Sequence, residues 1–188
     1  MGIDPGLANT GWGVVESIGP RLRPLAYGCI STEADQGLSY RLAVLNDQVT
    51  AAIERYKPDA LAIEKIYFGA NVKSAIATAQ ARGAVLVAAG KSELELGEYT
   101  PMQIKKAVVG TGAAEKDQVQ YMVKAVLELD HEPKPDHAAD ALAAAICHAR
   151  MRLTNNAQAQ MNRRFRGMND ERDAWARAVD SGKVGTKR

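Results

Sequence analysis

Short apolar runs and helical apolar periods alternate along most of the chain. Residues 2–4 and 60–64 are short apolar runs, and residues 10–17, 23–31 and 94–99 are short mixed stretches bounded by turn residues; all five are predicted to be strands. In residues 38–56, apolar side chains recur every three or four positions, which predicts a helix. Further helices are predicted over residues 72–89, over a short stretch after Thr100 and Pro101, and over residues 115–127 and 137–153.

The predicted boundaries agree with local turn and cap chemistry. A Gly-Pro turn joins the second and third predicted strands, and Lys57-Pro58-Asp59 ends the first helix. Thr100 is placed as a helix N-cap, with Pro101 at the first helical position. Three strands with short links, followed by strands that alternate with helices, predict an α/β fold. Its centre is a mixed five-stranded sheet flanked by helices.

The C-terminal part has a different composition. Residues 151–188 carry a net charge of +5, whereas residues 1–150 carry −3. Residues 155–166 are polar and lack an apolar period, so a linker is predicted there, followed by one weak helix over 169–179. We therefore expect a folded domain over 1–153 and a flexible basic tail over 154–188. A basic tail on a mildly acidic body is common in nucleic-acid-binding proteins.

The composition also argues against several classes of protein. No apolar run approaches the roughly 18 residues of a membrane span, and no secretory signal precedes the first strand. Two cysteines, Cys29 and Cys147, are too few for a disulfide framework. We expect a cytoplasmic protein with reduced thiols and no membrane partner.

Three acidic residues mark the chemistry. Asp4 and Glu64 each end a short apolar run, and Asp140 lies near the start of a predicted helix. A carboxylate at the end of a buried strand is held rigidly while its oxygens reach the sheet edge. Carboxylates that converge there suit Mg²⁺ or Mn²⁺, and two such ions can clamp a phosphodiester during attack by water.

Several separate stretches resemble one known family. They are G-I-D-P-G-L-A-N-T-G-W-G-V-V, A-I-E-K-I-Y-F, Q-A-R-G, V-V-G-T-G-A-A-E-K-D-Q-V-Q and D-H-A-A-D-A-L-A-A-A-I. In this order they resemble the RuvC family of Holliday junction resolvases, within the ribonuclease H-like superfamily, from Gly2 to about His148. The resemblance implies a homodimeric endonuclease that cuts four-way DNA junctions by paired symmetric nicks, in recombination and repair. It also implies partnership with a RuvA/RuvB branch-migration complex.

The resemblance implies catalytic, metal-binding residues at Asp4, Glu64, His137 and Asp140, with two Mg²⁺ or Mn²⁺ ions per site. Family members carry Asp or His three residues before the last Asp, which is His137 here. His137 could instead act as a general base or position the water. Asp136 lies one helical turn before Asp140, so spacing also allows it as a ligand, while its ordinary role would be a helix N-cap.

The resemblance also implies DNA contacts. Tyr67 aligns with an aromatic that stacks on an unpaired base, with Phe68 as the reserve, and Lys105 and Lys116 match basic positions that face phosphates. The Ala-rich helix over 72–89 matches the helix that pairs across the dimer axis. One departure is that only Met1 precedes G-I-D-P-G, where relatives have several apolar residues, so we expect weaker pairing of the first strand.

Three alternatives remain at this stage. D-P-G-L-A-N-T-G also fits the phosphate loop of actin-like and sugar-kinase ATPases, which would bind ATP-Mg²⁺ through Gly6 and Gly11. Those proteins usually need a second similar domain, for which this chain is too short. A junction-binding protein that does not cut would be expected to lack an acid, and none is missing. A related nuclease for RNA intermediates should lack the V-V-G-T-G-A-A-E-K-D-Q-V-Q stretch.

Overall fold

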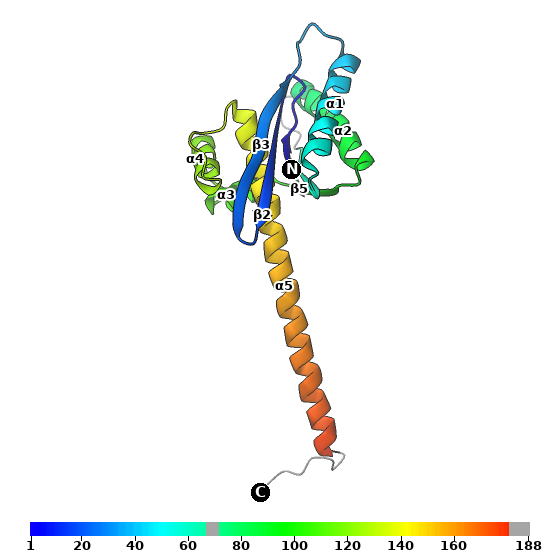
Figure 1. Cartoon of the computed structure of the whole chain (residues 1–188), viewed down its shortest axis with the longest axis vertical. Coiled ribbons are helices and arrows are strands. Elements are labelled where there is room, and N and C mark those ends of the chain that lie inside the picture. The colour runs from blue at the N-terminus through cyan, green and yellow to red at the C-terminus, as the bar shows by residue number, and fades with distance from the viewer. Residues whose placement is uncertain (67–71, 181–188) are drawn as a thin grey trace. The chain divides into compact units, whose positions relative to one another are not determined.

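The computed structural model describes residues 1–66 and 72–180, and for residues 72–74, 160 and 162–180 it describes the backbone alone. Within these ranges one five-stranded sheet has the order β3-β2-β1-β4-β5 (Figure 1). Its strands are β1 (Gly2–Asp4), β2 (Asn9–Ile18), β3 (Arg21–Ser31), β4 (Ala60–Glu64) and β5 (Glu95–Tyr99). β1, β2 and β3 pair antiparallel, whereas β4 lies parallel to both β1 and β5.

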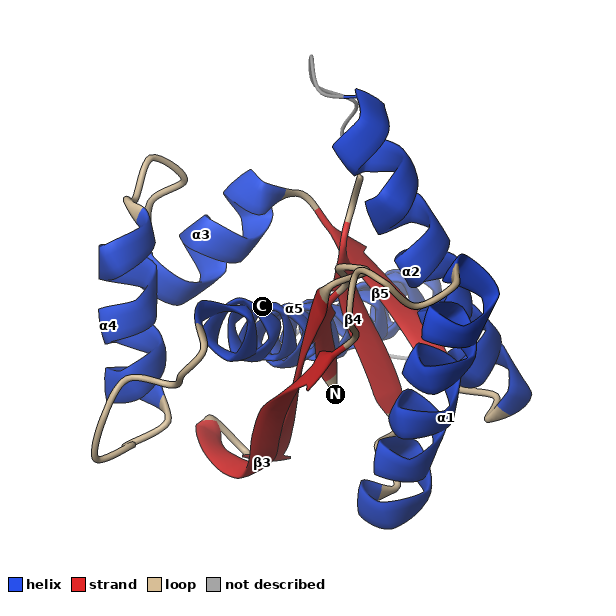
Figure 2. Ribbon diagram, turned by 90° about the horizontal axis from the view of Figure 1, so that it is seen from above, coloured by secondary structure: helices blue, strands red, loops and turns tan. Residues whose placement is uncertain are grey.

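Helices cover both faces of this sheet. They are α1 (Leu38–Tyr56), α2 (Val72–Lys91), α3 (Pro101–Val109), α4 (Lys116–Val126) and α5 (Asp136–Asp180). Figure 2 shows α1 and α2 on one side of the sheet, and α3, α4 and the start of α5 on the other. The predicted fold class, a mixed five-stranded sheet flanked by helices, is confirmed.

Local chemistry explains where the elements begin and end. The β2–β3 hairpin turns at Gly19, whose φ of 60° is accessible to glycine at little cost. Thr100 caps α3: its hydroxyl accepts from the Gln103 amide, and the Gln103 side chain accepts from the Thr100 amide. Lys57 ends α1 in the left-handed conformation. The predicted cap, turn and helix stop are all present.

The apolar core lies between the sheet and the α1–α2 pair. Ile3, Leu61 and Ile63 from the central strands are fully buried, together with Leu45 and Val49 of α1. Full burial of such side chains stabilises a fold by about 1.5–3 kcal/mol each. Pairing of β1 extends to Met1, whose carbonyl oxygen accepts from the Ala62 amide at 2.7 Å.

Glycines on the other face let α5 approach the sheet backbone closely. Gly2 pairs with Gly13 across β1 and β2, and Asp4 pairs with Gly11. A Cβ added at Gly2 would overlap the carbonyl oxygen of Ala141, and one at Gly11 would overlap that of His137. The absence of side chains at these positions therefore sets the position of the first turns of α5.

The prediction of a linker over residues 155–166 is wrong, because α5 is helical from Asp136 to Asp180. Eight of its twelve residues are Ala, Gln, Arg or Met, which are good helix formers even without an apolar face. Periodicity measures burial rather than helicity, and an exposed helix shows none. The first compact unit spans Met1–Arg150. No helix in the described part of the chain is both long and apolar enough to cross a membrane.

Candidate active site

Strand register brings Asp4 and Glu64 to one face at one end of the sheet. Gly2 pairs with Ala62 and Ile3 with Ile63 across the parallel β1–β4 pair. Since side chains alternate between faces, Asp4 lies on the face of Gly2, and Glu64 on the face of Ala62. This is the face that receives α5. Both carboxylates therefore end adjacent parallel strands and point toward the start of that helix.

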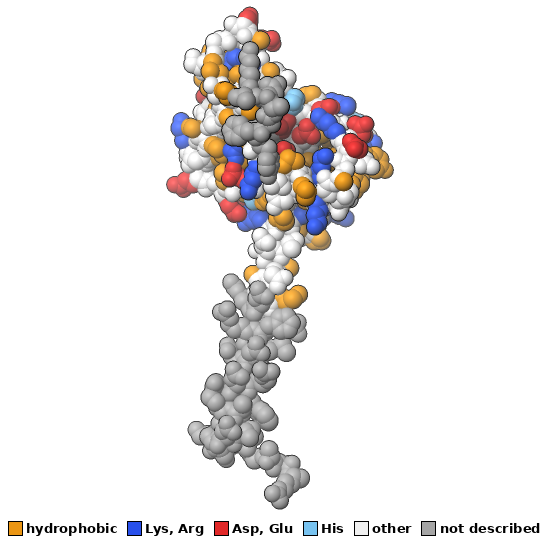
Figure 3. Space-filling view, turned by 180° about the vertical axis from the view of Figure 1, so that it is seen from behind, with side chains coloured by type: hydrophobic (Ala, Val, Ile, Leu, Met, Phe, Trp, Pro, Cys, Tyr) orange, Lys and Arg blue, Asp and Glu red, His pale blue; other side chains and the backbone are white. Residues whose placement is uncertain are grey.

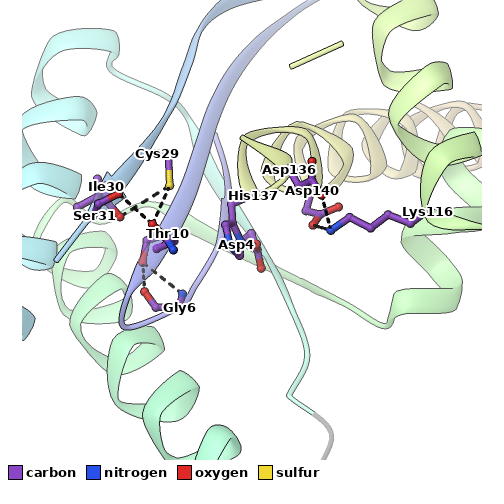
Figure 4. Close-up of polar contacts among 11 residues, drawn as sticks. Asp4, Gly6, Thr10, Cys29, Ile30, Ser31, Lys116, Asp136, His137 and Asp140 are labelled. Carbon is purple, nitrogen blue, oxygen red and sulfur yellow. Dashed lines mark hydrogen bonds and ion pairs between the residues drawn. The ribbon is translucent and has the colours of Figure 1, made fainter. Parts of the chain in front are cut away.

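The first turn of α5 supplies two more site residues. Nδ1 of His137 lies 2.7 Å from Oδ2 of Asp4, so an imidazole and a carboxylate that are 133 positions apart in the chain are in contact (Figure 4). Asp140 is on the same helix face, three residues further on. The structure thus places the four residues that the resemblance implied, Asp4, Glu64, His137 and Asp140, in one region, with Asp4 and His137 in direct contact.

Lys116, at the start of α4, reaches into this cluster. Its Nζ lies 3.4 Å from Oδ2 of Asp140 and 3.3 Å from Oδ2 of Asp136 (Figure 4). Sequence reasoning assigned Lys116 to DNA phosphates and missed both ion pairs. No spacing signal could have revealed them, because the lysine and the two carboxylates lie on different helices joined by a loop.

A cavity of about 300 Å³ opens beside the acidic residues. Its walls combine carboxylates and lysines at one side with apolar side chains of α3, α4 and α5. They are Glu64, Pro101, Ile104, Lys105, Lys116, Val119, Asp140 and Ala143. Lys105, predicted from the resemblance, therefore lies at the same cavity as Glu64. Figure 3 shows acidic and basic side chains close together on one face of the molecule, with a histidine beside acidic groups.

Desolvation and neighbouring negative charge raise the pKa values of Glu64 and Asp140. Although part of Glu64 is exposed, desolvation of its carboxyl group, with the negative charges of Asp4 and Asp140, raises its pKa to about 7, against the opposing effect of Lys105. Desolvation and Asp4 likewise raise the pKa of Asp140, while Lys116 opposes the shift. Burial by itself would lower the pKa of Lys116, but Asp140 and Asp136 raise it. The cluster therefore holds negative charge that its neighbours only partly compensate.

This donor set fits a divalent cation. Three carboxylates and an imidazole are ligands that Mg²⁺ and Mn²⁺ accept. A cation among them would favour the charged forms of Glu64 and Asp140, which desolvation and the neighbouring acids disfavour. Among the described residues, no three His, Cys, Asp or Glu side chains are drawn together as a ready metal-binding group. Lys116 and His137 instead contact the acids.

Tyr67 and Phe68 lie outside the described residues. Asp136 is the first residue of α5, and its carboxylate contacts Lys116 and, at 3.6 Å, Nζ of Lys134. In this structure Asp136 is thus engaged by lysines.

The raised pKa of Glu64 makes the free energy of unfolding depend on pH. Because the folded protein holds this proton up to about pH 7, the folded state binds more protons than the unfolded state from about pH 4.5 upward. Without divalent ions, the free energy of unfolding should therefore fall between about pH 5 and 7, by about 1–2 kcal/mol after allowance for solvent screening. Urea unfolding at several pH values measures this. The fall should be smaller in Glu64→Gln, in which the raised pKa of Asp140 still contributes, and an equal fall in that variant would assign it to other groups.

The sheet order and the acidic end of its central strands define the class of protein, a ribonuclease H-like nuclease fold. The yeast mitochondrial Holliday junction resolvase shares this fold, with a TM-score of 0.58 at 14% identity over 85% of this chain and 84% of that one. The family described as "Crossover junction endodeoxyribonuclease RuvC" matches residues 1–148. The chain belongs to the RuvC family.

Similar proteins cover nearly the same region. The RuvC of Desulforamulus reducens is 49% identical over 154 residues, which are 82% of this chain and 94% of that protein. The RuvC of Ruminiclostridium cellulolyticum is 50% identical over 148 residues, 79% of this chain and 89% of that one. The structure of Thermus thermophilus RuvC in complex with a Holliday junction substrate matches with a TM-score of 0.79 at 36% identity, covering 82% and 94% of the two chains.

Proposed function

We propose that this protein is a structure-selective endonuclease that resolves four-way DNA junctions by hydrolysing phosphodiester bonds, in recombination and repair. The observation that carries the proposal is that Glu64, Asp140, Lys105 and Lys116 line one cavity, with Asp4 close enough to Glu64 and Asp140 to act on both electrostatically. Carboxylates and lysines together suit a cation-assisted reaction on a polyanion. Family membership supplies the junction as substrate class.

Two divalent ions, Mg²⁺ or Mn²⁺, are proposed as cofactors. Asp4 would hold both, Glu64 the one at the attacking water, and Asp140 with His137 the one at the leaving oxygen. When bound, such ions supply Lewis acidity and a water of lowered pKa. His137 holds the Asp4 carboxylate in place through the 2.7 Å contact, and its imidazole favours Mn²⁺ more than a fourth carboxylate would.

Lys105 and Lys116 are proposed to bind backbone phosphates at the cavity, and Tyr67, with Phe68 as reserve, to stack on an unpaired base. The basic region 154–188 would add sequence-independent, salt-dependent affinity. By family analogy the protein would work in the cytoplasm with RuvA/RuvB. The ATP-binding alternative is not favoured, because the face of Gly11 that would receive a phosphate is covered by the His137 backbone.

Lys105→Gln should weaken junction binding without abolishing it. Loss of one phosphate contact should reduce the slope of log affinity against log salt by about 1. Fluorescence anisotropy with a labelled junction at 50–300 mM salt, about the range in which such contacts are resolved, measures the slope. Lys91→Gln, an exposed lysine at the end of α2, is the matched control. An unchanged slope in Lys105→Gln would remove Lys105 from the DNA-binding surface.

A homodimer is proposed to form across α2. The sheet side of this helix is buried at Ala81, Val85 and Ala88, whereas Ile76 and Val87 are 51% and 52% exposed. Eleven residues are about three helical turns, so these two side chains share a face, with Gly83 between them and open space beside it. An apolar stripe with a glycine on an exposed helix face suits pairing with a second copy. Two copies would supply two sites for symmetric nicks.

Gly83→Arg should convert the dimer to a monomer. A Cβ at Gly83 meets nothing within 4 Å in the single chain, so we expect the fold to survive while the paired helices separate. Sedimentation velocity measures the oligomeric state, and a junction assay should show single nicks in place of paired ones. Glu54→Arg, on the exposed side of α1, is the control. A dimer that persists in Gly83→Arg would place the interface elsewhere.

The proposed activity is tested with a labelled four-way junction that has a mobile core, beside linear duplex, in Mg²⁺ and in Mn²⁺. Paired symmetric nicks on the junction alone support a resolvase and identify the working ion. Tight binding without nicks in either metal would support a junction-binding protein that does not cut. Equal cleavage of linear duplex would contradict selectivity for junction structure.

A further inference from the structure

Lys116 forms ion pairs with two carboxylates, of which Asp140 lines the cavity and Asp136 does not. Asp140 lines the cavity with Glu64, and its carboxyl group is desolvated, as expected of a group that receives a cation. Asp136 lies one turn earlier on α5 and is absent from the cavity lining. The Nζ of Lys116 is almost equally distant from both, at 3.4 and 3.3 Å.

Asp136 is paired with two lysines at once. Besides Lys116, its carboxylate contacts Nζ of Lys134 at 3.6 Å. These contacts span two helices and the loop before α5. A carboxylate paired with two ammonium groups can keep one of them beside the site, and has less capacity left for a metal ion.

We propose that Asp136 is a positioning residue that shares Lys116 with Asp140. A divalent ion can then displace Lys116 from Asp140 while the lysine stays beside the site on Asp136. The inference rests on the proposed function, because it assumes that Asp140 holds a divalent ion. With both carboxylates present, Lys116 can shift by a short distance and still face a backbone phosphate. Without Asp136, the ammonium group would pair with Asp140 alone and compete more strongly with the cation.

The test measures Mn²⁺ binding to the full-length protein without DNA, by the electron paramagnetic resonance signal of free Mn²⁺. Four proteins form a double-mutant cycle: wild type, Asp136→Asn, Lys116→Met and the double variant. Asp136→Ser repeats the change with a residue that also favours a helix start, in case Asn disturbs the helix. Asp117→Asn, an exposed carboxylate next to Lys116 in sequence, measures the general effect of removing one negative charge.

Lys116→Met should strengthen Mn²⁺ binding, and Asp136→Asn should weaken it about fivefold, the upper range for one exposed ion-pair partner. In the Lys116→Met background, Asp136→Asn should weaken Mn²⁺ binding only as much as Asp117→Asn does, by about twofold or less. If Asp136→Asn weakens Mn²⁺ binding just as much in that background, the proposal is overturned and Asp136 is a metal ligand. The proposal is also overturned if neither Asp136→Asn nor Asp136→Ser weakens Mn²⁺ binding in the otherwise wild-type protein.

The proposed function is tested separately by the junction-cleavage assay, and it fails if the wild-type protein does not nick a junction. Mn²⁺ binding requires neither DNA nor turnover, so the two results are independent. If wild-type protein binds no Mn²⁺ at all, both this inference and the metal-dependent mechanism are rejected. If it binds Mn²⁺ with the predicted coupling but does not nick, only the activity is rejected.

Discussion

Glu64→Gln is expected to reduce junction cleavage by about 10³-fold or more, because a metal ion contributes several kcal/mol of transition-state stabilisation at about 1.4 kcal/mol per tenfold. Glutamine keeps the shape of the side chain but loses the charge. Glu64 ends β4 and lines the cavity, where desolvation and the neighbouring acids Asp4 and Asp140 raise its pKa. Junction affinity, measured in Ca²⁺ or without divalent ions, should stay within about twofold, since Lys105 and Lys116 remain.

Single-turnover cleavage and binding of the same labelled junction measure both effects. Glu54→Gln removes an exposed carboxylate on α1 and should cleave at the wild-type rate. If Glu64→Gln loses binding and cutting in equal measure, Glu64 has a structural role and the metal assignment for β4 is wrong. Retained cleavage at more than about one tenth of the wild-type rate would exclude an essential ligand role.

Gly11→Ala is expected to lower the free energy of unfolding by about 3 kcal/mol, the upper range for overpacking a close contact. The added Cβ would overlap the carbonyl of His137 and press on the amide of Ala138, both backbone atoms that cannot rotate away. For a domain of this size the Tm should fall by about 6–12 °C. Because α5 would be displaced from Asp4, protein that remains folded should still cleave about 10²-fold more slowly, as for a 1 Å misplacement.

Thermal unfolding followed by circular dichroism, together with cleavage well below the Tm, separates the two effects. Gly37→Ala is the matched control, because a Cβ there meets nothing within 4 Å. Its only expected effect is the loss of glycine as the N-cap of α1, which should lower the free energy of unfolding by about 1 kcal/mol or less. A Tm within about 2 °C of wild type for Gly11→Ala would show that α5 does not need this close approach.

Local patterns were sufficient for most of the secondary structure. The α1 and β4 boundaries agree with their predicted ranges, and the Thr100 cap and the hairpin turn are present, because each depends on residues close together in the chain. The 155–166 stretch failed because a helix without a buried face has no apolar period to detect. Asp4, Glu64 and Asp140 could be selected from their places at strand and helix ends. Their grouping with His137 came from resemblance to a family, not from spacing.

The sequence by itself determined most of the elements, the α/β class and which acids are proposed to carry the chemistry, since these follow from local periodicity, caps and recurring motifs. Only the tertiary structure decided how the acids meet. Strand register puts Asp4 and Glu64 on one face, and the bare backbone at Gly2 and Gly11 lets α5 bring His137 to 2.7 Å from Asp4. The sharing of Lys116 was likewise decided by packing of α4 beside α5. Contacts between residues far apart in the chain depend on how the elements pack, which no local pattern encodes.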